Sequence, residues 1–128
     1  MRPVLAGDVF ALAHAIEEIP VQERFKTCAI LIEETDFADK YRKQFGLLHP
    51  VWGNGSLMGR VGQLERLRGA APSFQSPDFC ASVVTALEAL TLWRDLKSRR
   101  SGQANLPIPS EISELSPSIP ALPLHSRN

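Results

Sequence analysis

Residues 20–46 read PVQERFKTCAILIEETDFADKYRKQFG, and this stretch decides the fold class. Pro20 and Gly46 enclose a segment, Val21 to Phe45, that contains neither proline nor glycine. Proline suits the first turn of a helix, where its missing N–H would have no partner, and glycine suits a left-handed cap at the end. Apolar side chains recur at three- and four-residue spacing, so the segment predicts one long helix. Leu31 and Phe37 widen its apolar stripe, which implies packing on more than one side and leaves open which face is buried. The stripe itself consists of Val21, Phe25, Cys28, Ile32, Ala38, Tyr41 and Phe45.

A second helix is expected directly before this one. Apolar residues again recur at helical spacing from about Val9 to Ile19, and Asp8 is placed to cap the segment. Pro20 ends it, because the proline ring excludes an interior helical position. Two helices joined at one proline predict a helical hairpin or corner.

Two further helices are expected after the hairpin, and no segment reads as a strand. Ser56 opens a short helix whose apolar row is Leu57, Val61, Leu64 and Leu67. Ser76 caps a longer one, with Pro77 in its first turn and a cationic end near Arg100. Its predicted buried stripe is Phe79, Cys80, Val83, Val84, Leu87, Leu90 and Leu92 or Trp93. The sequence therefore predicts an all-α protein.

The loop between the second and third helices, within Tyr41–Met58, is rich in glycine and aromatic residues. Gly53-Asn54-Gly55 is typical of a turn with positive φ, and Trp52 is expected to anchor the loop to the core.

The composition changes after the helical domain, which we place at residues 1–100. Five of the ten prolines fall in residues 101–128, a spacing that excludes a long helix. Aliphatic residues keep returning between these prolines, which favours a flexible, extended peptide that docks on a partner. Passive disorder is the alternative. The expected partner-binding residues are Ile112, Leu115, Ile119 and Leu122.

Charge is segregated along the chain although the net charge of the 128 residues is zero. Residues 1–39 carry 3 bases and 8 acids, whereas residues 40–100 carry 10 bases and 4 acids. Such a bipolar chain can stack head to tail or offer a basic face to a polyanion; solvated helix faces without a partner are the alternative.

Localisation is predicted to be cytoplasmic, without a membrane partner. Cys28 and Cys80 are expected to be buried thiols, as in a reducing compartment. The first residues lack the pattern of a signal peptide, and no apolar run reaches the length of a membrane span.

Candidate catalytic residues are few. His49 and Ser56 share one loop, but a histidine before a proline is more often a hydrogen-bonded turn residue. The acidic group Glu33, Glu34, Asp36 and Asp39 has no histidine at the spacing of a metal motif. We therefore expect no enzyme activity, no metal and no cofactor; an enzyme that uses His49 is the remote alternative.

Cationic residues at the end of the long helix and after it are the candidates for contact with DNA phosphates. No recognition-helix pattern accompanies them, so base-specific binding is not expected. The candidate DNA-binding residues are Lys40, Arg42, Lys43, Arg60, Arg66 and Arg68.

The strings MRPVLAGD at residues 1–8 and YRKQFGLLHPVWGNGSLM at residues 41–58 resemble a family of small bacterial proteins associated with gene transfer agents, as the small terminase subunit of their DNA-packaging motor. The resemblance covers roughly residues 1–90. It implies a helical protein that forms a homo-oligomer, in some cases a ring, binds double-stranded DNA, and recruits the large terminase subunit, an ATPase–nuclease, through a C-terminal segment. The usual helix-turn-helix domain of phage small terminases is not found in this sequence.

The leading hypothesis is thus a non-enzymatic, oligomeric DNA-packaging adaptor that binds DNA weakly or non-specifically. The alternative is a protein-interaction or regulatory adaptor with no nucleic-acid role.

Overall fold

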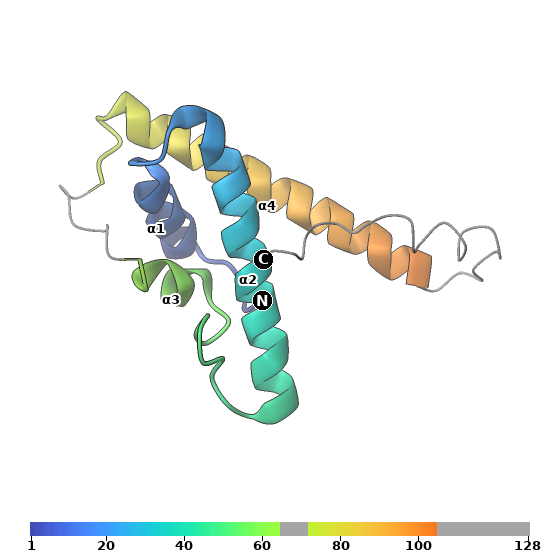
Figure 1. The fold of residues 1–128 in the computed structure, drawn as a ribbon. Helices are drawn as coiled ribbons and strands as arrows, with labels where there is room; N and C mark the ends of the chain where they lie inside the picture. Colours follow the sequence, from blue (N-terminus) through green and yellow to red (C-terminus); the bar gives the residue numbers. More distant parts are fainter. Residues whose placement is uncertain (65–71, 105–128) are drawn as a thin grey trace. The chain divides into compact units, whose positions relative to one another are not determined.

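Four helices form the part of the protein that the computed structural model describes, residues 1–64 and 72–104 (Figure 1). They are α1 (Ala6–Ile16), α2 (Val21–Phe45), α3 (Leu57–Gly62) and α4 (Pro77–Ala104). These residues contain no strand, and the all-α prediction is confirmed. The chain divides after Asp95, and the unit Met1–Asp95 contains the core described below.

The hairpin of α1 and α2 forms as predicted, but α1 both begins and ends about three residues earlier than expected, because a turn at residues 17–19 separates Ile16 from Pro20. Asp8 is not the cap, because it lies within the first turn and its carboxylate accepts a hydrogen bond from the backbone N–H of Leu5 at 2.8 Å. A carboxylate in this position reaches back to the helix start, as in a capping box. The other oxygen of Asp8 accepts the N–H of Met58 at 2.9 Å and so joins the starts of α1 and α3.

The ends of α2 agree with the prediction, and the structure decides which part of its broad apolar stripe is buried. Gly46 closes the helix with φ 72°. Cys28 and Ile32 in the middle of the stripe are buried, whereas Val21 and Phe45 at its ends are 71% and 56% exposed. Several inward positions of this helix are occupied by polar side chains, which form hydrogen bonds or ion pairs there. Its buried residues are Arg24, Cys28, Leu31, Ile32, Thr35, Asp36, Ala38 and Asp39.

A hydrophobic core joins all four helices. It combines Leu12 and Ile16 of α1 with Ile32 of α2, Val61 of α3 and Leu90 of α4. Cys28 also lies in this core, and burial raises the pKa of its thiol to about 12. The other members of the core are Val9, Ala15, Leu31, Leu57, Ala86, Ala89 and Trp93.

α4 starts as predicted, but the residues that it buries differ from the predicted apolar stripe. Ser76 accepts the N–H of Phe79 on its hydroxyl at 3.3 Å, with Pro77 as the first helical residue. Val84 and Leu87 are about half exposed, at 53% and 48%. Small residues let α4 approach its neighbours closely on another face, and the larger aliphatics are left outside. The buried face is Phe79, Ser82, Ala86, Ala89, Leu90 and Trp93.

Cys80 is also more exposed than predicted, because it lies beside this outward stripe. Its Sγ is 3.4 Å from the carbonyl oxygen of Phe74. The helix continues to Ala104, a turn beyond the predicted end near Arg100.

A buried arginine links the hairpin turn to α4. The guanidinium of Arg24 donates to the carbonyl oxygens of Glu17 at 2.7 Å and Ile19 at 2.8 Å. It also donates to Asp78 at 2.9 Å and to the hydroxyl of Ser82 at 3.2 Å. Figure 1 shows the hairpin turn beside the start of α4, where these contacts lie.

Among residues 1–64 and 72–104, none of the helices is both long and apolar enough to cross a membrane.

Candidate interaction site

The loop after α2 folds back on that helix. His49 and Gly53 exchange backbone hydrogen bonds of 3.0 and 3.2 Å, and Gly53 and Gly55 have φ of 86° and 90°. Gly55 passes so close to α2 that an added Cβ would lie 2.8 Å from the Cα of Asp39. The predicted positive-φ turn is confirmed. It fixes the loop against the second half of α2.

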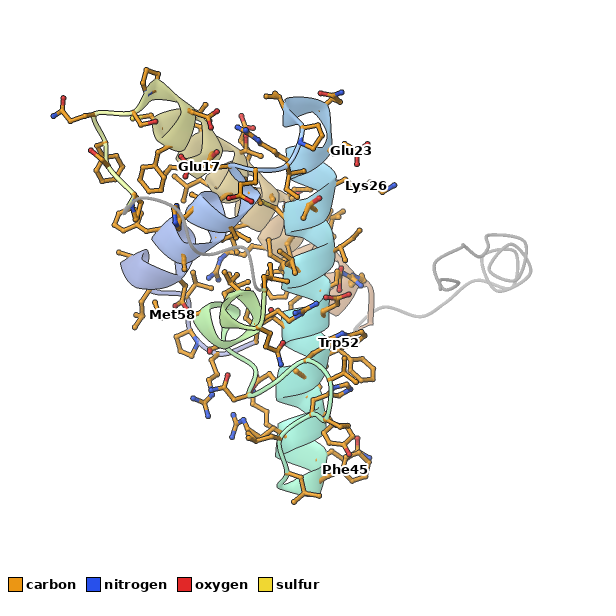
Figure 2. The ribbon with its side chains drawn as sticks, turned by 60° about the vertical axis from the view of Figure 1, so that its left-hand side comes forward. Glu17, Glu23, Lys26, Phe45, Trp52 and Met58 are labelled. Carbon is orange, nitrogen blue, oxygen red and sulfur yellow. The ribbon has the colours of Figure 1, made fainter. Side chains whose placement is uncertain are left out.

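Five rings from α2 and this loop form an aromatic cluster, defined here as Phe37, Tyr41, Phe45, His49 and Trp52. The rings of His49 and Trp52 stack at 5.0 Å with an interplanar angle of 8°. Phe37 meets the Trp52 ring edge-on, at 5.6 Å. Figure 2 shows Trp52 beside the second half of α2 and Phe45 at the end of that helix, with Glu23 and Lys26 near its start.

His49 has a structural task in this cluster. Its Nδ1 accepts the backbone N–H groups of Val51 at 3.1 Å and Trp52 at 3.0 Å. The neutral ring therefore carries its hydrogen on Nε2. The hydroxyl of Ser56 donates to Asn54 at 2.8 Å and caps α3 by accepting the N–H of Gly59 at 3.0 Å. These contacts do not pair His49 with Ser56 as a base with a nucleophile.

Asp36 and Asp39 are buried on the inner side of α2, and each carboxylate forms ion pairs with positively charged groups. The Met1 ammonium contacts Asp36 Oδ1, and Lys40 Nζ lies 3.0 Å from Asp36 Oδ2. Burial favours a raised pKa for Asp36, but hydrogen bonds and charge from Met1 and Lys40 outweigh it and hold the pKa at about 2. The pKa of Asp39 is also lowered, because Arg42 and Lys43 outweigh the effect of its burial.

Four of the six predicted DNA-contacting residues can be placed, and each lies beside a carboxylate. Arg42 and Lys43 are 2.9 and 3.1 Å from Asp39. The side chains of Lys40 and Lys43 are 68% and 67% exposed, so these two ammonium groups face solvent while they are paired. Arg60 pairs with Glu34 at 2.8 Å and is only 15% exposed.

The other predicted site residues lie outside the part of the chain that the structure describes. They are Arg66, Arg68, Ile112, Leu115, Ile119 and Leu122.

Two hollows share Glu34 of α2, and we call them together the outer groove. The first is lined by α1, α2, α3 and nearby residues, and the second by α2 and Trp52 of the loop after it. The first has a volume of about 210 Å³, and its apolar lining includes Ile19, Ile30 and Leu64. The second has a volume of about 270 Å³, with the rings of Phe37 and Trp52 in its lining. The charged residues that line the second are Glu33, Glu34, Asp36 and Lys40.

The outer groove was missed by the reasoning from sequence. Ile30 and Phe37 are 47% and 54% exposed, and they lie opposite the buried face of α2. Their spacing of seven residues is two helical turns, so a second apolar stripe was visible in the sequence. The broad spread of apolar residues around α2 concealed it, because one stripe was assigned to the core.

No group of three or more His, Cys, Asp or Glu side chains within residues 1–64 and 72–104 is arranged to hold a metal ion.

A family model described as a domain of unknown function, DUF7742, matches residues 2–90. Neither a curated protein nor a solved structure matches the chain.

Proposed function

The chain belongs to the DUF7742 family, and we propose that it acts as a non-enzymatic, oligomeric adaptor in DNA packaging. In this role it resembles a small terminase subunit: it binds double-stranded DNA weakly and without sequence preference, and it recruits the large terminase ATPase–nuclease. The family match covers a domain of unknown function, so the support comes from the surface of the protein and from the sequence resemblance.

The observation that carries the adaptor role is the large exposed apolar surface around the aromatic cluster. Leu47, Leu48 and Val51 at the loop tip are 62%, 64% and 62% exposed, and Phe45 beside them is 56% exposed. Contiguous apolar patches of this kind usually mark protein-interaction sites, because exposure to water is unfavourable for them. A framework that holds rings and aliphatic side chains outward suits assembly with other proteins.

The DNA part of the proposal depends on Lys40 and Lys43. Both ammonium groups are exposed one turn apart at the end of α2. Their pairing with Asp36 and Asp39 means that a phosphate must compete with a carboxylate for each of them. Binding is therefore expected to be weak, strongly dependent on salt, and effective only when several copies act together.

The same pairing favours a second candidate function, a protein-interaction or regulatory adaptor with no nucleic-acid role. The four placed cations meet carboxylates within 3.1 Å, so the basic surface predicted from sequence is largely neutralised. In this case the lysines only keep the end of α2 in solution.

Titration of duplex DNA at several salt concentrations separates the two candidates. The wild-type chain should bind at low salt, and Lys40→Gln/Lys43→Gln should bind more weakly, with a salt slope smaller by about 2. Lys26→Gln removes an exposed charge near the other end of α2 and should bind as the wild type does. Absence of binding by the wild type even at low salt would remove the DNA role and leave the second candidate.

Recruitment of the large terminase subunit is tested with the purified full-length chain. Leu115→Ser/Ile119→Ser in the C-terminal segment should abolish co-purification with the large subunit, since the expected contact is aliphatic. Val84→Ser/Leu87→Ser serves as the comparison, because it alters exposed aliphatic residues of α4 that lie outside both proposed contact surfaces. Equal co-purification by the wild type and the tail variant would contradict the assignment of the tail.

A further inference from the structure

We propose that His49 is a pH-sensitive latch: its neutral imidazole holds the tip of the loop after α2 in place, and protonation of the ring releases that tip. The loop tip is defined here as residues 47–52. This inference goes beyond the proposed function, because it concerns the conformation of the loop, and its test needs neither DNA nor a partner protein.

The neutral imidazole is an acceptor for two backbone groups at once. Nδ1 of His49 accepts the N–H of Val51 at 3.1 Å and the N–H of Trp52 at 3.0 Å. The side chain thus takes the place of the backbone acceptor in a tight turn. Pro50 lies inside this turn and has no N–H to contribute. The path of the loop tip therefore depends on one nitrogen lone pair.

The same ring joins the loop tip to α2. The imidazole of His49 stacks on Trp52 at 5.0 Å. The rings of Tyr41 and Phe37, both in α2, meet the imidazole edge-on at 4.9 and 5.6 Å. A change in the orientation of the imidazole is therefore transmitted to the contact between the loop tip and the helix.

Protonation removes the acceptor. An imidazolium carries a hydrogen on each ring nitrogen and can only donate. The Nδ1–H of His49 would then face the N–H groups of Val51 and Trp52, and three donors would point at one another without an acceptor. Either the ring turns away or the turn opens. The stack on Trp52 acts in the opposite sense, because an aromatic face attracts a cation, but it cannot replace the lost lone pair.

The buried carboxylates of α2 cannot produce the same response. Histidine is the side chain that ordinarily changes its charge between about pH 5 and about pH 8. The pKa of Asp36 is about 2, and the pKa of Asp39 is also lowered, so both carboxylates stay ionised in that range. The other charged residues that line the hollow beside Trp52 are Glu33, Glu34 and Lys40, and Tyr41 is the titratable residue in ring contact with His49.

The release is local. The backbone hydrogen bonds between His49 and Gly53 and the close approach of Gly55 to α2 involve no imidazole atom, so they are retained. The part that changes is the loop tip, which carries the exposed side chains of Leu47, Leu48 and Val51. In acid the loop tip loses its fixed shape while the helices remain folded.

Nuclear magnetic resonance of the full-length, ¹⁵N-labelled chain tests the latch from about pH 8 to about pH 5. The imidazole nitrogen shifts of His49 report its tautomer and charge, and at the upper pH they should show a neutral ring with its hydrogen on Nε2. As the ring becomes protonated, the hydrogen-exchange protection factor of the Trp52 amide should fall by about tenfold or more, because its acceptor is lost. The amides of α1 should keep their protection.

Two substitutions of His49 separate the acceptor from the charge. His49→Asn places an oxygen that does not titrate near the position of Nδ1, so the Trp52 amide should stay protected at every pH. His49→Ala has no acceptor and should show low protection at every pH. The matched control is His14→Gln, at a histidine that contacts Glu17 at 2.9 Å, and it should leave the response of the loop unchanged. Circular dichroism checks that each variant retains its helices.

Three results would overturn the latch. One is constant protection of the Trp52 amide while the imidazole signals show that His49 becomes protonated. Another is a ring that stays neutral down to about pH 5. The third is an unchanged pH response in His49→Asn, which keeps every charged neighbour of Trp52. None of these results bears on the adaptor role, and failure of the DNA and co-purification tests would leave the latch standing.

Discussion

Gly55 shows how a single residue positions the loop against α2. Two constraints meet there: φ is 90°, and an added Cβ would lie 2.7 Å from the Cβ of Asp39 and 2.8 Å from its Cα. Backbone atoms of a helix cannot move away as a flexible side chain can. We predict that Gly55→Ala lowers the free energy of unfolding by about 3 kcal/mol, from the left-handed backbone and the clash together. Urea denaturation measures this loss.

Gly46 provides the matched control for that prediction. It also has positive φ, at 72°, but open space surrounds the position of its missing Cβ. Gly46→Ala should therefore carry only the backbone cost of about 1 kcal/mol. Equal losses for the two variants would show that the contact of Gly55 with Asp39 has no energetic weight.

At the scale of the elements, Arg24 decides how the hairpin turn meets α4. Its side chain is 8% exposed, and it satisfies two carbonyl oxygens of the turn as well as Asp78 and Ser82. Arg24→Met keeps most of the apolar volume but leaves those carbonyl groups without a donor. We expect a loss of about 2–4 kcal/mol in thermal or urea denaturation.

Asp78 is the comparison, because its side chain is 52% exposed. Water can replace an exposed partner, and asparagine still offers an acceptor. Asp78→Asn should thus cost no more than about 1 kcal/mol. A larger loss for Asp78→Asn than for Arg24→Met would indicate that the ion pair, and not the bonds to the turn, holds the two elements together.

The boundaries of α2 and the starts of α3 and α4 could be predicted because they depend on local chemistry, whereas the bounds of α1 and the end of α4 differ from the prediction. Pro20 and Gly46 delimit α2, and Ser56 and Ser76 cap α3 and α4, since each acts on groups within a few residues. The faces of α2 and α4 could not be predicted in the same way. Both helices have apolar residues on more than one side, and burial of Arg24 and Asp39 depends on partners elsewhere in the chain.

For the molecule as a whole, the acidic cluster on α2 makes stability dependent on pH. The pKa of Asp36 in the folded protein is about 2, below its usual 3.8, so ionisation of Asp36 stabilises the fold. This contribution, about 2 kcal/mol, is complete above pH 3.8 and is lost as the pH falls toward 2. Asp39 acts in the same direction.

Asp36→Asn should reveal this contribution. At neutral pH the variant is expected to be less stable than the wild type by about 2 kcal/mol. The difference should become small near pH 2, where half of the wild-type carboxyl groups are protonated, and vanish below it. Urea denaturation over this pH range measures both proteins. A constant difference at every pH would show that the loss comes from packing and not from charge.

Truncation after Ser101 tests how the molecule is divided. The unit that contains the core ends at Asp95, so its packing does not require the removed residues. The melting temperature is expected to change by no more than about 2 °C, which corresponds to a few tenths of a kcal/mol. A fall of more than about 10 °C would mean that the C-terminal segment belongs to the folded core.

The sequence by itself determined the helices, the two ends of α2, the starts of α3 and α4, and the positive-φ turn after α2, because caps, prolines and glycines act locally. Only the tertiary structure decided which faces of those helices are buried. It also decided that Arg60 meets Glu34, and that Ile30 and Phe37 line two hollows that share Glu34. Lys40, Arg42 and Lys43 instead meet carboxylates three or four residues earlier on the same helix, a spacing that the sequence already contains. Arg60 and Glu34 are far apart along the chain and become partners only when the helices pack.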